Sequence, residues 1–153
     1  MPNVDLYTDG AASGNPGPGG YGAVLRFNGH EKKLSQGYRR TTNNRMELLA
    51  VIVGLKALNK PCNVTVYSDS KYVCDAVEKK WLFSWEKTYF KKKKNPDLWI
   101  EFLKLYRQHS VRFVWIKGHA GHEYNEICDQ LAVEASKGSD LKIDEGYEES
   151  VED

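Results

Sequence analysis

The chain has 153 residues, of which 41% are hydrophobic and 28% charged, and its formal net charge is +1. A chain of this length and composition can bury one substantial core, so we expect a single domain. No apolar run reaches membrane-spanning length and the first residues lack the basic and apolar regions of a signal peptide, so we expect a soluble, cytoplasmic protein without membrane contact.

The small net charge hides an uneven distribution of charged residues. Residues 140–153 contain seven acids and one lysine, whereas residues 79–94 mix lysines with aromatic side chains. A charge run usually marks only a solvated face, but basic residues mixed with aromatic ones also suit a polyanion with stackable bases. We therefore predict a domain over residues 1–139 and a flexible acidic tail after it.

The first three predicted strands belong to the N-terminal part of the chain. Residues 4–9 alternate between apolar and polar side chains and run into a glycine-rich loop. The Asn28-Gly29 pair predicts a tight hairpin between two further strands, so the three strands should form an antiparallel meander. The letters GPGGYG fit a dinucleotide-binding pattern, but Pro18 and the strand-like residues that follow argue against that function.

Helices and strands alternate in the rest of the chain. A helix that begins at Thr42 or Asn43 is predicted by a capping side chain and apolar residues at helical spacing. Asn95 followed by Pro96 is a strong helix start, with the side chain of Asn95 as the expected cap and proline at the first helical position. The order βββαβαβα predicts a single α/β domain of the mixed α+β kind. Its five-stranded mixed sheet would hold three antiparallel and two further parallel strands, flanked by helices. The other elements are a strand at residues 64–69, a helical region from Ser70 to about Trp85 with a break in its aromatic and lysine-rich part, a strand at 111–117 and a helix at 124–137.

Two of these strands end on an aspartate. Asp9 ends the first strand and Asp69 the fourth, and if the two strands are parallel neighbours both carboxylates emerge at the same edge of the sheet. Glu47 lies in the first turns of the helix that connects them, and Asp129 lies in the first turns of the last helix. We expect these four acids, from four separate elements, to converge on one pocket.

Clustered carboxylates need compensation. Two carboxylates about 4 Å apart repel by roughly 4 kcal/mol at an effective dielectric near 20. A hard divalent cation relieves the repulsion, and oxygen-only ligands indicate Mg²⁺ or Mn²⁺ rather than zinc. Two such ions can clamp the attacking water and the leaving oxygen of a phosphodiester. Each acid alone is better explained as a strand end or a helix cap, but their combined placement favours a nuclease site.

Five stretches, spread from about residue 4 to residue 135, together match one family. They are YTDGAASGNPGPGGYGAVLR, GYRRTTNNRMELLAVIVGLKAL, YSDSKYV, NPDLW and WIKGHAGHEYNEICDQLA. The chain resembles ribonuclease H of the bacterial type 1 branch. The resemblance implies a ribonuclease-H-like fold and a monomeric endonuclease that hydrolyses the RNA strand of RNA/DNA hybrids. It also implies two Mg²⁺ ions per active site, with Mn²⁺ as an alternative, and products that carry 5′-phosphate and 3′-hydroxyl ends.

The same resemblance implies functional residues. It makes Asp9, Glu47, Asp69 and Asp129 the metal ligands, and it makes His119 a group that moves protons or helps the product to leave. A solvated loop position is the alternative for His119, and core packing is the alternative for Trp81. The implied substrate contacts are Gly10, Asn15, Asn43 and Asn44 at the minor groove, Arg40, Thr42 and Asn95 at a phosphate of the DNA strand, and Trp81, Lys91, Lys92, Lys93 and Lys94 in a basic protrusion that holds DNA.

Two other classes of protein compete with this interpretation. Integrases, transposases and resolvases also place acids on such a sheet, so the fold alone does not separate them. The stretches RRTTNNRMEL and GHAGH favour ribonuclease H. A module that binds hybrids without cutting them would lack at least one of the four acids, and none is missing.

Overall fold

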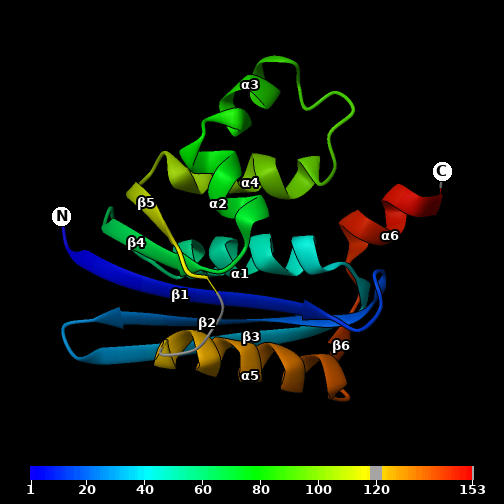
Figure 1. Cartoon of the computed structure of the whole chain (residues 1–153), viewed down its shortest axis with the longest axis horizontal. Coiled ribbons are helices and arrows are strands. Elements are labelled where there is room, and N and C mark those ends of the chain that lie inside the picture. Colours follow the sequence, from blue (N-terminus) through cyan, green and yellow to red (C-terminus); the bar gives the residue numbers. More distant parts are fainter. Residues whose placement is uncertain (118–121, 153) are drawn as a thin grey trace.

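The computed structural model describes residues 1–117 and 122–152, which form one mixed sheet with helices on both faces (Figure 1). The sheet has six strands in the order β5-β4-β1-β2-β3-β6. In chain order the elements are β1 (Asn3–Ala12), β2 (Gly17–Phe27), β3 (His30–Thr41), α1 (Asn43–Lys56), β4 (Asn63–Ser68), α2 (Lys71–Glu78), α3 (Trp81–Lys87), α4 (Pro96–Tyr106), β5 (Ser110–Trp115), α5 (Glu123–Lys137), β6 (Leu141–Lys142) and α6 (Glu145–Glu152).

The antiparallel half of the sheet is the predicted meander of β1, β2 and β3. Phe27 pairs with His30 across a two-residue turn, in which Asn28 has φ 47° and Gly29 has φ 78°. Positive φ at both turn residues is what a tight hairpin needs to match the twist of its strands. The hairpin prediction is therefore confirmed.

The parallel half of the sheet sets the edge from which the predicted acids emerge. β1 pairs with β4 in parallel, with Tyr7 opposite Tyr67, and β4 pairs in parallel with β5. Asp9 and Asp69 each lie two residues beyond that pair, toward the same end of the two strands. Asp69 directly follows β4 as expected, but β1 continues to Ala12, so the prediction that Asp9 ends its strand is wrong. The helix between the two strands, α1, packs against β1.

The main core lies between this half of the sheet and the helices α1 and α4 (Figure 1). Leu6 and Val66 from the sheet, Ile52 from α1 and Trp99 and Phe102 from α4 are fully buried. Burying one such large apolar side chain contributes about 1.5–3 kcal/mol, so these contacts hold α1 firmly against the strands that carry the acids. None of the described helices is both long and apolar enough to cross a membrane.

The C-terminal part of the sheet differs from the sequence prediction. The sheet has six strands rather than five, because Leu141 and Lys142 pair with Gly37 and Tyr38 of β3. The break predicted in the helical region from Ser70 to about Trp85 is confirmed: it separates α2 from α3, where Lys80 adopts a left-handed conformation with φ 63°. The domain boundary at residue 139 stays a prediction, but the segment beyond it contains β6 and α6.

Candidate active site

Three acids from three elements meet at the edge of the sheet. Each of Asp9 on β1, Glu47 on α1 and Asp69 after β4 offers a carboxylate oxygen, and these oxygens lie within 4.8 Å of one another. Gly10 permits this approach, because a Cβ at that position would collide with the backbone of Glu47 and come within 2.8 Å of Met46 Cβ. The glycine thereby lets the first turns of α1 lie directly on the end of β1.

The electrostatics of this group disfavour full ionisation. Burial and then the charges of Asp9 and Asp69 raise the pKa of Glu47 well above its usual value. Glu47 Oε2 is buried and has no hydrogen-bond partner within residues 1–117 and 122–152. An all-oxygen donor set with a buried unpartnered oxygen fits a hard divalent cation, which would relieve both the repulsion and the desolvation.

The other two predicted catalytic residues stand apart from this group. Asp129 is half-buried on α5 and does not belong to the group of three in the part of the chain that the structure describes. His119 lies outside the described residues. The roles of both residues remain predictions.

Two supporting side chains were not found by sequence reasoning. Asn125, only 1% exposed, donates from Nδ2 to the carbonyl of Tyr67 at 3.0 Å, and so ties the first turns of α5 to the strand before Asp69. Trp115 donates from Nε1 to the carbonyl of Asp69 itself at 3.1 Å. In the sequence, Asn125 could have been singled out only because it lies four residues before Asp129, on the same face of the predicted helix. Nothing in the local pattern marked Trp115.

Several predicted substrate contacts line one cavity of about 570 Å³ beside the acid group's helix. Its lining includes Asn15, Thr42, Asn44, Asn95, Lys93 and Lys94. Thr42 also caps α1, with its Oγ1 accepting from Arg45 N at 3.3 Å, and the backbone N–H of Asn43 donates to Asn15 Oδ1 at 3.2 Å. Arg40 is exposed at the end of β3 and is not part of this lining within the described residues.

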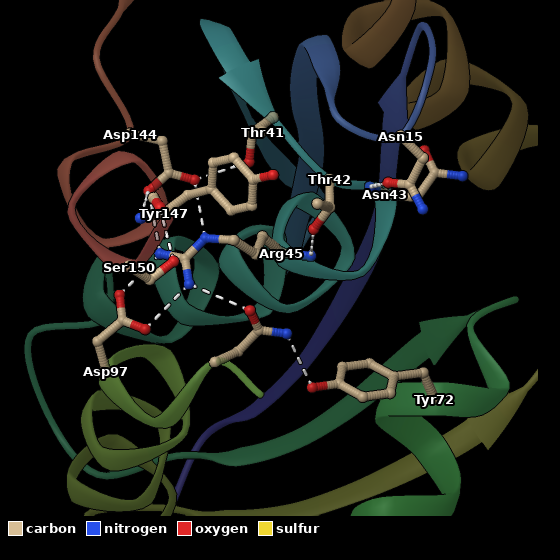
Figure 2. Close-up of polar contacts among 11 residues, drawn as sticks. Asn15, Thr41, Thr42, Asn43, Arg45, Tyr72, Asp97, Asp144, Tyr147 and Ser150 are labelled. Carbon is tan, nitrogen blue, oxygen red and sulfur yellow. Dashed lines mark hydrogen bonds and ion pairs between the residues drawn. The ribbon is translucent and has the colours of Figure 1, made fainter. Parts of the chain in front are cut away.

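Asn95 has a different local role from the one predicted. It occupies the N-cap of α4 before Pro96, as expected, but its side chain makes no cap hydrogen bond. The left-handed backbone, with φ 61°, turns the amide elsewhere: Oδ1 accepts from Arg45 Nη1 at 3.2 Å and Nδ2 donates to Tyr72 OH at 3.1 Å (Figure 2). The predicted capping bond is therefore wrong, and the amide is instead fixed between Arg45 and Tyr72.

The aromatic and basic residues of the predicted protrusion gather around a second cavity of about 360 Å³. Trp81 is 47% exposed, and Lys79 Nζ lies 5.1 Å from the centre of its ring. Core packing, the alternative for Trp81, is thus wrong, whereas Trp85 packs edge-on against the buried Trp99. The lining consists of Tyr72, Trp81, Trp85, Lys92, Lys93 and Lys94. Lys91 is exposed nearby in the sequence, outside this lining as far as the structure describes it.

Known proteins resemble the chain in both sequence and structure. A family model described as RNase H matches residues 1–137. The ribonuclease H of Desulforamulus reducens is 55% identical over 149 residues, which is 94% of either chain, and that of Rippkaea orientalis is 56% identical over 150 residues, 95% of this chain and 92% of the relative. Among solved structures, LC9-RNase H1 superposes with a TM-score of 0.80 at 31% identity, covering 99% of this chain and 81% of the other. LC11-RNase H1, solved in complex with an RNA/DNA hybrid, superposes with a TM-score of 0.62 at 28% identity over 86% of this chain and 95% of the other.

Proposed function

The chain belongs to the ribonuclease H family, and from this premise we propose that it cuts the RNA strand of RNA/DNA hybrids as an endonuclease. Family members are metal-dependent endoribonucleases that act on such hybrids. The observation that carries the proposal for this chain is the group of Asp9, Glu47 and Asp69, whose oxygens lie within 4.8 Å of one another. We assign two divalent ions to this site, Mg²⁺ first and Mn²⁺ as an alternative.

The acids of the site have a binding role in this proposal. Asp9, Glu47 and Asp69 hold the ions, and Asp129 joins them from α5. Bound there, the ions would activate a water and stabilise the leaving oxygen of the phosphodiester. Attack of water on phosphorus breaks the bond to the 3′-oxygen, which takes up a proton. The products therefore carry a 3′-hydroxyl and a 5′-phosphate.

Other residues position the site or serve proton transfer. Trp115 holds the backbone of Asp69, and Asn125 holds α5 against the strand that precedes it. These two hydrogen bonds limit how far Asp129 and Asp69 can move apart, and a small misplacement of a catalytic group is costly. We assign proton transfer, or assistance to product release, to His119, because an imidazole titrates near neutral pH.

The surface beside the acids supplies substrate recognition. Amides of Asn15, Asn43 and Asn44 can both donate to and accept from groups in the minor groove, and backbone groups near Gly10 can reach the 2′-hydroxyl that distinguishes RNA from DNA. Thr42 and Asn95, with Arg40 close by, suit a phosphate of the DNA strand. Their common cavity supports this assignment, because it holds polar donors next to Lys93 and Lys94.

The decisive test compares matched RNA/DNA, RNA/RNA and DNA/DNA duplexes of one sequence in Mg²⁺, with EDTA as the control. Cleavage of the RNA strand of the hybrid alone, with 5′-phosphate ends, is the expected result. Comparable cleavage of the DNA/DNA duplex would instead place the chain with the DNA-cutting enzymes that share this fold.

A second test addresses the basic protrusion. Replacing Lys91, Lys92, Lys93 and Lys94 by alanine should raise KM for the hybrid more than it lowers kcat. It should also flatten the salt dependence of KM by roughly one unit of slope for each phosphate that the lysines no longer neutralise. An unchanged slope would show that these lysines only form a solvated face.

A further inference from the structure

The C-terminal helix α6 borders the cavity to which we assign a DNA phosphate. Figure 1 shows α6 at the end of the molecule opposite to the N-terminus, beside the start of α1. Tyr147, Ser150 and Val151 of α6 line the same cavity as Thr42 and Asn95. None of these three α6 residues has a part in the proposed function, so the presence of the helix at this place needs its own explanation.

A buried anchor fixes the start of α6. Asp144 Oδ2 accepts from Arg45 Nε at 2.8 Å and from Thr41 Oγ1 at 2.7 Å, and its Oδ1 accepts from the backbone N–H of Tyr147 at 3.2 Å (Figure 2). Gly146 allows this close approach, because a Cβ there would lie 2.8 Å from Arg45 Nη2. The position of α6 is therefore fixed by Asp144, the residue that directly precedes the helix.

From this anchor, α6 contacts two arginines at the end of β3. Arg39 donates from Nε and Nη2 to the two carboxylate oxygens of Glu148, at 2.9 and 2.7 Å. The Arg40 guanidinium lies 5.7 Å from the centre of the Tyr147 ring. Arg40 is the arginine assigned to the DNA phosphate. Both contacts are exposed to solvent, where ion pairs and cation–π contacts are weak enough for a polyanion to replace them.

The negative charge of α6 repels the DNA phosphate that the nearby arginines and lysines attract. Its sequence EGYEESVE contains four glutamates and no basic residue. Negative charges act over roughly 10 Å at 0.1 M salt, which is the scale of a helix diameter. A DNA phosphate that approaches the cavity therefore meets repulsion from α6 and finds the nearby guanidiniums already engaged.

We propose that α6 is an intramolecular competitor of the DNA strand. It engages Arg39 and Arg40 through Glu148 and Tyr147, and a bound hybrid has to replace these contacts. The inference rests on the proposed function, since it takes the hybrid as the ligand. The opposite possibility, that Tyr147 and Ser150 add favourable contacts to the substrate, predicts weaker binding when α6 is removed.

The test removes α6 and keeps its anchor. A chain that ends at Asp144 retains the partner of Arg45, and the substitution Asp9→Asn in both chains prevents cleavage while binding is measured. Fluorescence anisotropy with a labelled RNA/DNA hybrid should show roughly 5- to 10-fold tighter binding by the shorter chain at 50 mM KCl, and a difference of about 2-fold or less at 300 mM, because salt screens the repulsion. Equal or weaker binding at 50 mM by a shortened chain that melts cooperatively would overturn the inference.

Two single substitutions keep the test valid if the shortened chain does not fold. Glu148→Gln and Glu149→Gln make the same change of charge on the same helix, but of the two glutamates only Glu148 pairs with an arginine in the described ion pairs. Glu148→Gln should tighten hybrid binding by roughly 2- to 3-fold and Glu149→Gln by less. Equal effects would rule out competition for Arg39.

The Arg40 contact has its own matched pair of variants. Tyr147→Ala removes the ring over Arg40 and should tighten binding, whereas Tyr147→Phe keeps the ring and should leave binding as in the parent chain. Weaker binding by both variants would contradict the inference. A cleavage assay on the chain without any of these substitutions distinguishes a failure of the proposed function from a failure of the inference about α6. If that chain does not cleave the hybrid, the proposed function is wrong. If it cleaves normally but the α6 variants bind the hybrid no differently from their parent, only the role of α6 is wrong.

Discussion

Two charged clusters begin two residues apart on α1 and are built in opposite ways. Arg45, whose side chain is 3% exposed, donates to two carboxylates, those of Asp97 and Asp144 (Figure 2). Glu47 instead faces two groups of its own sign, Asp9 and Asp69. The first cluster brings opposite charges together, and the second concentrates like charges at the site to which we assign the metal ions.

The pKa shifts of Arg45 and Glu47 reflect this difference between the two clusters. Burial alone would lower the pKa of Arg45, but hydrogen bonds to Asp97 and Asp144 outweigh it and raise that pKa. For Glu47, burial and the neighbouring charges act in the same direction and raise the pKa. The fold therefore favours the charged form of Arg45 and disfavours the charged form of Glu47. The cluster around Arg45 pairs opposite charges, whereas the cluster around Glu47 holds like charges whose repulsion a bound cation can relieve.

The largest expected effect is on catalysis at the like-charged cluster. Asp9→Asn should lower kcat by roughly 10⁴-fold, or about 5 kcal/mol, because a metal ligand is lost, while the Kd for the hybrid changes little. Steady-state cleavage in Mg²⁺ and anisotropy measure the two quantities. Asp5→Asn is the matched control, since it makes the same change on the same strand outside the group of three acids. Near-normal turnover by Asp9→Asn would remove the basis for the metal site.

The next effect concerns stability at the balanced cluster. Arg45→Ala should lower the free energy of unfolding by about 3–5 kcal/mol, because it leaves the buried carboxylate of Asp144 without its cation. Urea denaturation at pH 7 measures this change. Arg39→Ala, which removes an exposed arginine with an equally well-formed pair to Glu148, should cost less than about 1 kcal/mol. Similar costs for the two variants would show that burial does not decide the value of these pairs.

A smaller effect of opposite sign is expected at Glu47. Without metal, Glu47→Gln should raise the free energy of unfolding at pH 7 by about 1–2 kcal/mol. The raised pKa means that the folded protein holds a proton more tightly than the unfolded chain does. Folding stability is therefore lost as pH rises above the unfolded value near 4.5, and the glutamine variant does not share this loss.

Thermal melting in EDTA at pH 4 and pH 7 checks this prediction. The difference between Glu47→Gln and the parent chain should be present at pH 7 and almost absent at pH 4, where Glu47 is mostly protonated in the unfolded chain as well as in the folded one. Added Mg²⁺ should reverse the order at pH 7, because it stabilises only a chain that binds it. A lower melting temperature for the variant in EDTA at pH 7 would show that the cluster is not strained.

The like-charged cluster was predictable from the sequence in a way that the balanced one was not. Asp69 directly follows β4 and Asp9 lies inside β1, and the alternation of both strands is visible in the sequence. The parallel pairing of these strands follows from the helix between them. Asp144 pairs with Arg45 from 99 positions away, after a strand of only two residues. So short a strand has no period to detect, and an acidic composition predicts solvation rather than burial.

Side chains that support a site are also poorly marked in a sequence. Asn95 was correctly placed at the start of a helix, but a capping pattern does not reveal that tertiary partners will take its amide. Tyr72 receives hydrogen bonds from both Asn95 and Trp99, yet in the sequence it is only one aromatic residue of an amphipathic helix. Local chemistry therefore predicted most of the elements and the three acids that meet, whereas contacts between distant elements decided how these side chains are held.

The smallest expected effect is at Asp97, the more exposed of the two carboxylates that share Arg45. The side chain of Asp144 is 8% exposed and that of Asp97 is 44% exposed, so Asp144→Asn should cost about 2 kcal/mol of unfolding free energy and Asp97→Asn about 0.5 kcal/mol. The contribution of Asp97 should also depend on pH. Burial of Asp97 opposes ionisation, but its bonds to Arg45 outweigh this and lower its pKa below 3.8. The contribution of Asp97 to the free energy of unfolding is thus complete above pH 3.8 and is lost as pH falls through the lower pKa of the folded state. Urea denaturation at pH 6 and pH 3 should show the cost of Asp97→Asn shrinking on acidification. If Asp97→Asn costs as much unfolding free energy as Asp144→Asn at pH 6, solvent exposure does not weaken the pair between Asp97 and Arg45. Both carboxylates would then stabilise the buried Arg45 to the same extent.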